Sequence, residues 1–265
     1  MIVLLVQLVM LLVIIIAVEC NTEIDEATHV YLLEALAYKY GTYKSKDDHK
    51  YVDLYESLFQ SKRRHIKNMT EIGVSAGQSL QMWDDYFPDA EIHGIDILID
   101  DKVRSNLSNR KRVHLYQSDG TIETEVDKLE FRASTMDVII EDGPHTRESQ
   151  EKFLKLFWKF LKPNGLYIIE DVDAQRGGLD FQEHPERLEE FTREVLNHNH
   201  VFFVDTAVGH RNWEYWLKVV SSDWDIDHHT HNSYLLVIRK RAGREPQVFT
   251  NYGNVAMNVN NIVHH

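Results

Sequence analysis

The sequence of 265 residues contains few cysteines and few basic side chains. Cys20 is the single cysteine, so no disulfide can form within the chain. Lysine and arginine number 29 against 42 aspartate and glutamate residues, which gives a formal net charge of −13. Such a charge opposes attraction to nucleic acid phosphates. We therefore expect neither a disulfide-stapled domain nor a nucleic acid partner.

The glycine fingerprint of dinucleotide-binding enzymes, G-x-G-x-x-G, is also missing. Gly73 and Gly77 stand instead as G-x-x-x-G, and the sequence has no internal repeat. With 43% hydrophobic and 27% charged residues, the chain has the composition of a globular protein. Its length allows one large α/β domain.

An apolar run covers residues 2–18. It is slightly shorter than the ~20 residues of a membrane-spanning helix. Val18 and Cys20 are small and suit cleavage after Cys20, so we expect residues 1–20 to be a signal peptide for the secretory pathway. The alternative is an uncleaved membrane anchor, because no lysine or arginine precedes the run. A luminal domain could then carry a glycan on the Asn106 sequon.

Helix-like and strand-like segments alternate along the rest of the chain. Helical spacing of apolar residues predicts helices over 25–40 and 51–59, ahead of the first strand. Strands are expected at Met69–Val74, Glu91–Ile95, Val113–Tyr116, Met136–Ile140, Leu166–Ile169, Val201–Thr206 and Tyr234–Arg239. This alternation predicts an α/β fold with a Rossmann-like, doubly wound and mostly parallel sheet, preceded by N-terminal helices. We assign residues 21–241 to this domain and residues 242–265, which show no periodicity, to a flexible tail.

The stretch 69–97 combines a strand, a small-residue turn and a helix beginning near Ser79. Glycine in such a turn lets the backbone approach a ligand closely, and the helix N-terminus favours an anionic group. Asp96 ends the second strand, where its carboxylate can accept hydrogen bonds from ribose hydroxyls. Asp119 follows the third strand and is placed to lie near an adenine or ribose edge. The pattern predicts a half-site for a nucleoside cofactor.

Acidic residues also follow the fourth and fifth predicted strands. Asp142 comes after one, and Glu170 and Asp171 come after the other. Because the carboxyl ends of parallel strands meet at one edge of the sheet, we expect these carboxylates to converge. Mg²⁺ prefers such oxygen ligands. His145 lies in the same turn as Asp142, where an imidazole can take a proton from a metal-bound hydroxyl.

Three segments carry a family resemblance: TEIGVSAGQSLQMWDDYFPDAEIHGIDI, IIEDGPHTRESQ and LKPNGLYIIEDVD. They resemble the metal-dependent O-methyltransferases that modify macrolide sugars, of the mycinamicin and tylosin type, and YGTYKSKDDHKYVDLYESLF is similar to the segment upstream of that family's first strand. The resemblance covers roughly residues 38–173. It implies a class I methyltransferase fold that uses S-adenosylmethionine and Mg²⁺. We do not expect the auxiliary N-terminal domain of the mycinamicin type in this chain.

Site residues transfer by position from that family. The resemblance implies that His145 is the general base and that three carboxylates bind Mg²⁺, namely Asp142, Glu170 and Asp171. It implies cofactor contacts at Glu71, Gly73, Gly77, Ser79, Asp96 and Asp119. The sequence departs from the family's usual turn at Glu141 and Pro144, and from its usual residue after Asp119 at Gly120.

Together these features predict methyl transfer from S-adenosylmethionine to a hydroxyl of a small molecule. A non-catalytic nucleoside-binding module and a metal-dependent hydrolase are the alternatives. The presence of the proposed metal ligands and of His145 favours catalysis over a binding module. The glycine turn with Asp96 favours an enzyme that binds a nucleoside cofactor over a metal-dependent hydrolase. The partner expected is a small hydroxylated substrate, with no nucleic acid, and with a membrane only if residues 1–20 remain as an anchor. The sequence allows a homo-oligomer without specifying one.

Overall fold

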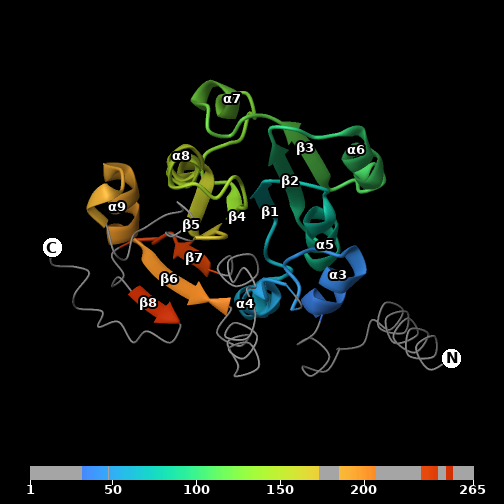
Figure 1. Cartoon of the computed structure of the whole chain (residues 1–265), viewed down its shortest axis with the longest axis horizontal. Coiled ribbons are helices and arrows are strands. Elements are labelled where there is room, and N and C mark those ends of the chain that lie inside the picture. Colours follow the sequence, from blue (N-terminus) through green and yellow to red (C-terminus); the bar gives the residue numbers. More distant parts are fainter. Residues whose placement is uncertain (1–31, 47, 173–184, 207–233, 244–248, 253–265) are drawn as a thin grey trace, which may run out of the picture.

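A computed structural model describes residues 32–46, 48–172, 185–206, 234–243 and 249–252. In this part of the chain an eight-stranded sheet runs in the order β3-β2-β1-β4-β5-β7-β6-β8 (Figure 1). Strands β1 to β5 are mutually parallel, and β7 is antiparallel to both of its neighbours, β5 and β6. The predicted doubly wound, mostly parallel α/β fold is confirmed.

The helices and strands follow the alternation expected from the sequence. In chain order they are α3 (Leu32–Tyr40), α4 (Tyr51–Phe59), β1 (Asn68–Ile72), α5 (Gln78–Tyr86), β2 (Glu91–Asp96), α6 (Asp101–Leu107), β3 (Val113–Gln117), α7 (Glu123–Asp127), β4 (Met136–Glu141), α8 (Arg147–Phe157), β5 (Leu161–Ile169), α9 (Glu190–His198), β6 (His200–Asp205), β7 (Tyr234–Arg239) and β8 (Phe249–Tyr252). Short 3-10 turns follow α4 and α8 and precede α9.

Alternating strand side chains divide the core between the two faces of the sheet. Val138 and Ile140 of β4 pack with α3, α4 and α5 on one face. Ile139, between them, packs with α8 and α9 on the other face. This is the period-2 alternation of a strand that is buried on both sides. Each large side chain removed from water contributes about 1.5–3 kcal/mol, so the two layers hold the strand ends in fixed positions.

Gly73 sets the close approach of β1 and β4 where the site begins. Its φ is +95°, and a Cβ placed there would lie 1.9 Å from the backbone oxygen of Asp142. The backbone N–H of Asp142 donates to the carbonyl of Ile72 at 2.8 Å, which fixes that spacing. Only glycine fits both the conformation and the space. The turn after β1 is thereby pressed against the turn after β4.

Several boundaries differ from those expected. β5 begins at Leu161 rather than at Leu166, because a shift in its pairing with β4 accommodates Pro163–Gly165 as an irregular stretch within the strand. Residues 123–131 are also predicted to form a helix, but the helix α7 ends at Asp127. β8 lies within the segment predicted to be a tail and pairs with β6. The domain boundaries themselves stay predictions.

The N-terminal apolar run lies outside the described residues. Among the residues that are described, no helix is both long enough and apolar enough to cross a membrane.

Candidate active site

A cavity of about 590 Å³ opens at the carboxyl ends of the parallel strands. The turns after β1, β2, β3, β4 and β5 all contribute to its wall, and the loop between α3 and α4 closes another side. Ligands of such sheets bind at this edge, as the sequence predicted. Its polar lining comprises Thr42, Tyr43, Lys44, His49, Ser75, Gln78, Ser79, Asp96, Ser118, Asp119, Thr121, Asp142, His145, Glu170 and Asp171.

Asp96 organises the turn after β1. One of its carboxylate oxygens accepts hydrogen bonds from the backbone N–H groups of Val74 at 2.7 Å and Ser75 at 3.2 Å. Its other oxygen accepts from the backbone N–H of Leu98 at 3.0 Å. Because a carboxylate has about four acceptor positions, the side chain can still accept from a ligand in the cavity. Asp96 therefore shapes the turn and remains available for the predicted ribose contact.

Asp119 lies on the same wall, one strand further along. Its Oδ1 accepts hydrogen bonds from the backbone N–H of Thr121 at 2.9 Å and from the Thr121 hydroxyl at 2.7 Å. A Cβ on the intervening Gly120 would lie 2.8 Å from the ring of Phe153. Gly120, where the sequence departs from the usual residue of the family, thus allows Phe153 of α8 to pack closely against the backbone.

The six residues predicted to contact the cofactor divide into two groups. Gly73, Ser79, Asp96 and Asp119 line the cavity. Glu71 is fully buried behind it and accepts a hydrogen bond from the Ser79 hydroxyl at 2.8 Å. Gly77, with φ +79°, begins α5 and packs against Leu107. The structure therefore gives Glu71 and Gly77 supporting positions, and their direct contact with a cofactor stays a prediction.

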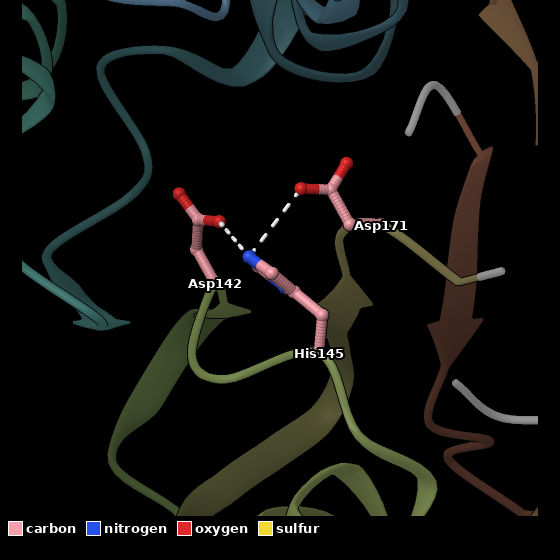
Figure 2. Close-up of side chains that lie close together, drawn as sticks. All are labelled: Asp142, His145 and Asp171. Atoms are coloured by element: carbon pink, nitrogen blue, oxygen red, sulfur yellow. Dashed lines mark ion pairs between the residues drawn. The ribbon is translucent and has the colours of Figure 1, made fainter. Parts of the chain in front are cut away.

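His145 points toward the carboxylates of Asp142 and Asp171 (Figure 2). Its Nε2 lies 3.4 Å from Asp171 Oδ2 and 3.9 Å from Asp142 Oδ1. His145 has φ 57° and Asp171 has φ 53°, both in the left-handed region that side chains other than glycine seldom adopt. Strain of this kind is concentrated at functional sites. The two turns are thus held so that these three side chains converge.

Lys44, which was not among the residues predicted for the site, lies among the carboxylates. Its Nζ is 2.6 Å from Glu170 Oε2, 2.7 Å from Asp142 Oδ2 and 3.3 Å from Glu71 Oε1. Burial alone lowers the pKa of a lysine, but the three carboxylates outweigh it and raise the pKa of Lys44 well above its usual value. No helical or strand periodicity marks this lysine. Its position in the family-like segment before α4 is the only signal that could have found it.

Aromatic side chains of α4 donate hydrogen bonds to the same acidic group. The Tyr55 hydroxyl donates to Glu170 Oε1, and the Tyr51 hydroxyl donates to Asp171 Oδ1. His49 Nδ1 lies 4.0 Å from that same Asp171 oxygen. Sequence periodicity correctly placed both tyrosines on the buried side of a helix, but it could not show that their hydroxyls reach the site.

The surroundings shift the pKa values of Asp142 and Asp171 in opposite directions. Burial raises the pKa of Asp171, and the imidazoles of His145 and His49 offset only part of that rise. Burial also disfavours the Asp142 carboxylate, but Lys44 and then His145 outweigh it and hold the pKa of Asp142 below its usual value. Asp142 is therefore the more firmly ionised of the two.

Glu141, one of the departures in the turn, lies inside the core rather than in the cavity. Its Oε1 accepts a hydrogen bond from the backbone N–H of Gly143 at 3.0 Å. Burial raises its pKa to about 8. Pro144, the other departure, lines the cavity. Neither change displaces Asp142 or His145.

The donor atoms around His145 fit a metal ion. One ligand atom each from Asp142, His145 and Asp171 lie within 4.8 Å of one another. Mg²⁺ is commonly held by one or two carboxylates and keeps several waters, and Asp142 and Asp171 supply that number. Glu170, the third predicted ligand, already has one oxygen on Lys44 and the other on Tyr55. Its role as a ligand stays a prediction.

Residues 70–172 match the sequence profile of a family described as a methyltransferase domain. The sheet order and the position of the cavity agree with that match, so the described part of the chain has the α/β fold of class I methyltransferases.

Two curated relatives identify the kind of enzyme that it resembles. The chain is 29% identical over 147 residues to mycinamicin VI 2''-O-methyltransferase of Micromonospora griseorubida, covering 53% of this chain and 36% of that protein. It is 31% identical over 149 residues to 8-demethyl-8-alpha-L-rhamnosyl tetracenomycin-C 2'-O-methyltransferase of Streptomyces olivaceus, covering 54% of this chain and 38% of that protein. The chain thus spans little more than a third of the length of these relatives. The predicted resemblance is confirmed.

A solved structure shows the same fold. The methyltransferase MycE from the mycinamycin pathway, solved with Mg, SAH and mycinamycin VI, superposes with a TM-score of 0.57 at 23% identity. The superposition covers 87% of this chain and 58% of MycE.

Proposed function

We propose that this protein transfers a methyl group from S-adenosylmethionine to a hydroxyl of a small molecule, with His145 as the general base and with Mg²⁺ in the site. One observation carries the proposal. A single cavity joins Asp96 and Asp119, which follow β2 and β3, to Asp142, His145 and Asp171, which follow β4 and β5. Since β1 lies between these strand pairs in the sheet, a nucleoside and an acceptor hydroxyl can lie on opposite sides of Gly73.

The chain's own residues divide the work between those two sides. Asp96 and Asp119 would hold the adenosine part of the cofactor, which supplies the methyl group. His145 Nε2 would accept the proton of the acceptor hydroxyl, and Asp171 would stabilise the resulting imidazolium from 3.4 Å. A Mg²⁺ ion held by Asp142 and Asp171 would lower the pKa of that hydroxyl. Positioning of the two reactants supplies much of the barrier reduction in such a transfer.

The relatives support a small hydroxylated substrate, because the names of both curated relatives specify methylation of an oxygen. MycE was solved with mycinamycin VI alongside SAH and Mg. The Mg and SAH bound in MycE support Mg²⁺ and S-adenosylmethionine as the cofactors here. A nucleoside-binding module without catalysis would have no use for a histidine that faces two carboxylates in the same cavity.

Calorimetric titration of the full chain with S-adenosylmethionine, with and without Mg²⁺, tests the proposal directly. Saturable binding of the cofactor is expected in both cases. Absence of binding would remove the methyltransferase proposal.

An assay of ester hydrolysis tests the alternative. Hydrolysis of a phosphate or acyl ester that needs metal but no S-adenosylmethionine would favour the metal-dependent hydrolase instead.

Asp96→Ala should weaken S-adenosylmethionine binding by about 1.5–3 kcal/mol, the range for losing hydrogen bonds to a charged group. Part of this loss would come from disordering the turn after β1, since the backbone N–H groups of Val74 and Ser75 also donate to this carboxylate. Calorimetry measures the affinity. Asp89→Ala is the matched control, because Asp89 is exposed and pairs with Lys67 away from the cavity. Equal affinities in the two variants would show that Asp96 does not contact the cofactor.

We further propose that residues 1–20 direct the chain into the secretory pathway, with membrane anchoring as the alternative. The apolar run and the small residues Val18 and Cys20 support this. The Asn106 side chain is exposed on α6, which suits a glycan. N-terminal sequencing after expression in eukaryotic cells should give Asn21 as the first residue. A soluble protein that keeps Met1 would contradict the proposal, whereas a membrane-bound protein that keeps Met1 would indicate the anchor.

A further inference from the structure

Tyr43 is the most exposed of the large hydrophobic side chains that line the cavity. Its exposed fraction is 71%, whereas Phe153, which supplies the other phenyl ring of the lining, is 4% exposed. Within the described part of the chain the Tyr43 side chain makes no hydrogen bond, ion pair or aromatic contact. Of these two rings, only that of Tyr43 is therefore open to a ligand.

The backbone around Tyr43 is fixed, although its side chain is exposed. Thr42 and Lys44, on either side of it, are 6% and 4% exposed. The Tyr43 carbonyl accepts a hydrogen bond from the backbone N–H of His49 at 3.1 Å, which closes the loop between α3 and α4. The Lys44 carbonyl accepts from the backbone N–H of Val52 at 3.1 Å, which ties this loop to α4. The backbone therefore needs no ordering when a ligand packs against the ring.

The contacts of the neighbouring Lys44 place this loop between the two sides of the cavity. Lys44 also lines the cavity, and its Nζ lies 3.3 Å from Glu71 Oε1 and 2.7 Å from Asp142 Oδ2. Glu71 belongs to β1, and Asp142 follows β4. The loop that carries Tyr43 thus lies at the junction of β1 and β4, where Gly73 separates the nucleoside side from the acceptor side.

The reacting group of S-adenosylmethionine would lie at that junction, because the methyl group passes from the nucleoside side to the acceptor side. The methyl group is carried on a sulfonium, a cation that has no N–H or O–H group to donate. A protein can contact such a cation through a carboxylate or through the face of an aromatic ring, which attracts cations within about 6 Å of its centre. The carboxylates of Asp142 and Asp171 are proposed to hold Mg²⁺, which leaves the open ring of Tyr43 for the sulfonium.

We propose that the ring of Tyr43 packs against the sulfonium of S-adenosylmethionine and favours this charged cofactor over the neutral product, S-adenosylhomocysteine. The inference rests on the proposed function, since it assumes that cofactor. When the methyl group leaves, the sulfur keeps the electron pair of the broken bond and becomes a neutral thioether. The attraction to the ring is then lost, so Tyr43 would hold the cofactor more tightly than the product.

Calorimetric titration of the full chain at a fixed Mg²⁺ concentration tests the inference with three probes. They are S-adenosylmethionine, S-adenosylhomocysteine, which lacks the charge, and sinefungin, which carries a protonated amine in place of the methylsulfonium. Tyr43→Leu removes the aromatic face and keeps an apolar side chain. It should weaken binding of the two charged probes by about three- to tenfold, and binding of S-adenosylhomocysteine by less than about twofold.

Two further variants are the controls. Tyr43→Phe keeps the ring and removes only the hydroxyl, so all three affinities should stay within about twofold of the parent. Tyr38→Leu is the matched control, because Tyr38 is a 51% exposed tyrosine of α3 that lies outside the lining of the cavity. This variant should bind all three probes as the parent does.

Two results in Tyr43→Leu would overturn the inference. An equal loss of affinity for charged and neutral probes would show that the ring contacts an uncharged part of the cofactor. Unchanged affinity for all three would show that it does not contact the cofactor. Either result leaves the proposed function in place, whereas a parent chain that binds none of the probes would overturn the proposed function and this inference together.

Discussion

His145→Ala is expected to lower the rate of methyl transfer by roughly 10²–10⁴-fold, the usual range for a lost general base. The reason is geometric. The imidazole lies on the cavity side of Asp171, 3.4 Å from its Oδ2, where it can receive a hydroxyl proton and share the charge with the carboxylate. The change leaves both aspartates and the Asp96 turn in place. Binding of S-adenosylmethionine should therefore be retained, so that the loss appears in turnover.

Single-turnover rates against pH, with a substrate found by screening hydroxylated small molecules, measure this effect. Raising the pH should partly rescue the variant, because hydroxide can take the proton that His145 would otherwise accept. His114→Ala is the matched control, since His114 pairs with Glu91 at 2.6 Å on an exposed part of the sheet. A His145 variant that turns over like the parent would reduce His145 to a structural residue of its turn.

Asp142→Asn should behave differently, because it removes a charged ligand and leaves the imidazole. We expect a higher Mg²⁺ concentration for half-maximal activity and little change in S-adenosylmethionine binding. Together the two variants separate the metal from the base.

The fold could be predicted from the sequence because apolar residues recur along the strands and helices with a regular period. Val138, Ile139 and Ile140 read as a buried strand, and the structure places them on alternate faces between two helical layers. Strand ends in a parallel sheet share one edge, so the sequence alone assigns Asp96 and Asp142 to a common site. The pairing register between strands that are distant in the sequence was harder to predict. The irregular start of β5 depends on its register with β4, which no local pattern encodes.

The site was predicted incompletely for a related reason. Position at a strand end does not determine which carboxylate oxygen faces the cavity. Asp171 and Glu170 are adjacent in sequence, yet one faces His145 and the other faces Lys44. Lys44 and His49 reach the site from a loop without periodicity. The contacts of Lys44 with Asp142 and with Glu170 join residues that are 98 and 126 positions apart in the sequence.

Glu141 gives the second large effect, on stability rather than on activity. Burial raises the pKa of its carboxyl from 4.5 to about 8. The folded chain therefore keeps this proton at pH values where the unfolded chain has lost it. Between those two pKa values the folded state binds more protons, so the free energy of unfolding falls as pH rises, by about 1.4 kcal/mol per pH unit, and levels off above pH 8.

Glu141→Gln should remove that dependence, because an amide stays neutral and its oxygen can still accept from the Gly143 backbone N–H. From pH 5 to pH 8 the stability of the variant relative to the parent should rise by about 3–4 kcal/mol. At pH 5 the variant should be equal or slightly less stable, since Glu141 Oε2 has no partner among the described residues and an amide nitrogen there would also be buried.

Urea unfolding at pH 5, 6.5 and 8 measures the difference. Glu148→Gln is the control, because Glu148 is an exposed residue of α8 that pairs with Lys152, and its removal should leave the pH profile unchanged. A Glu141→Gln protein whose stability relative to the parent is the same at all three pH values would show that Glu141 is already ionised in the folded state at pH 5.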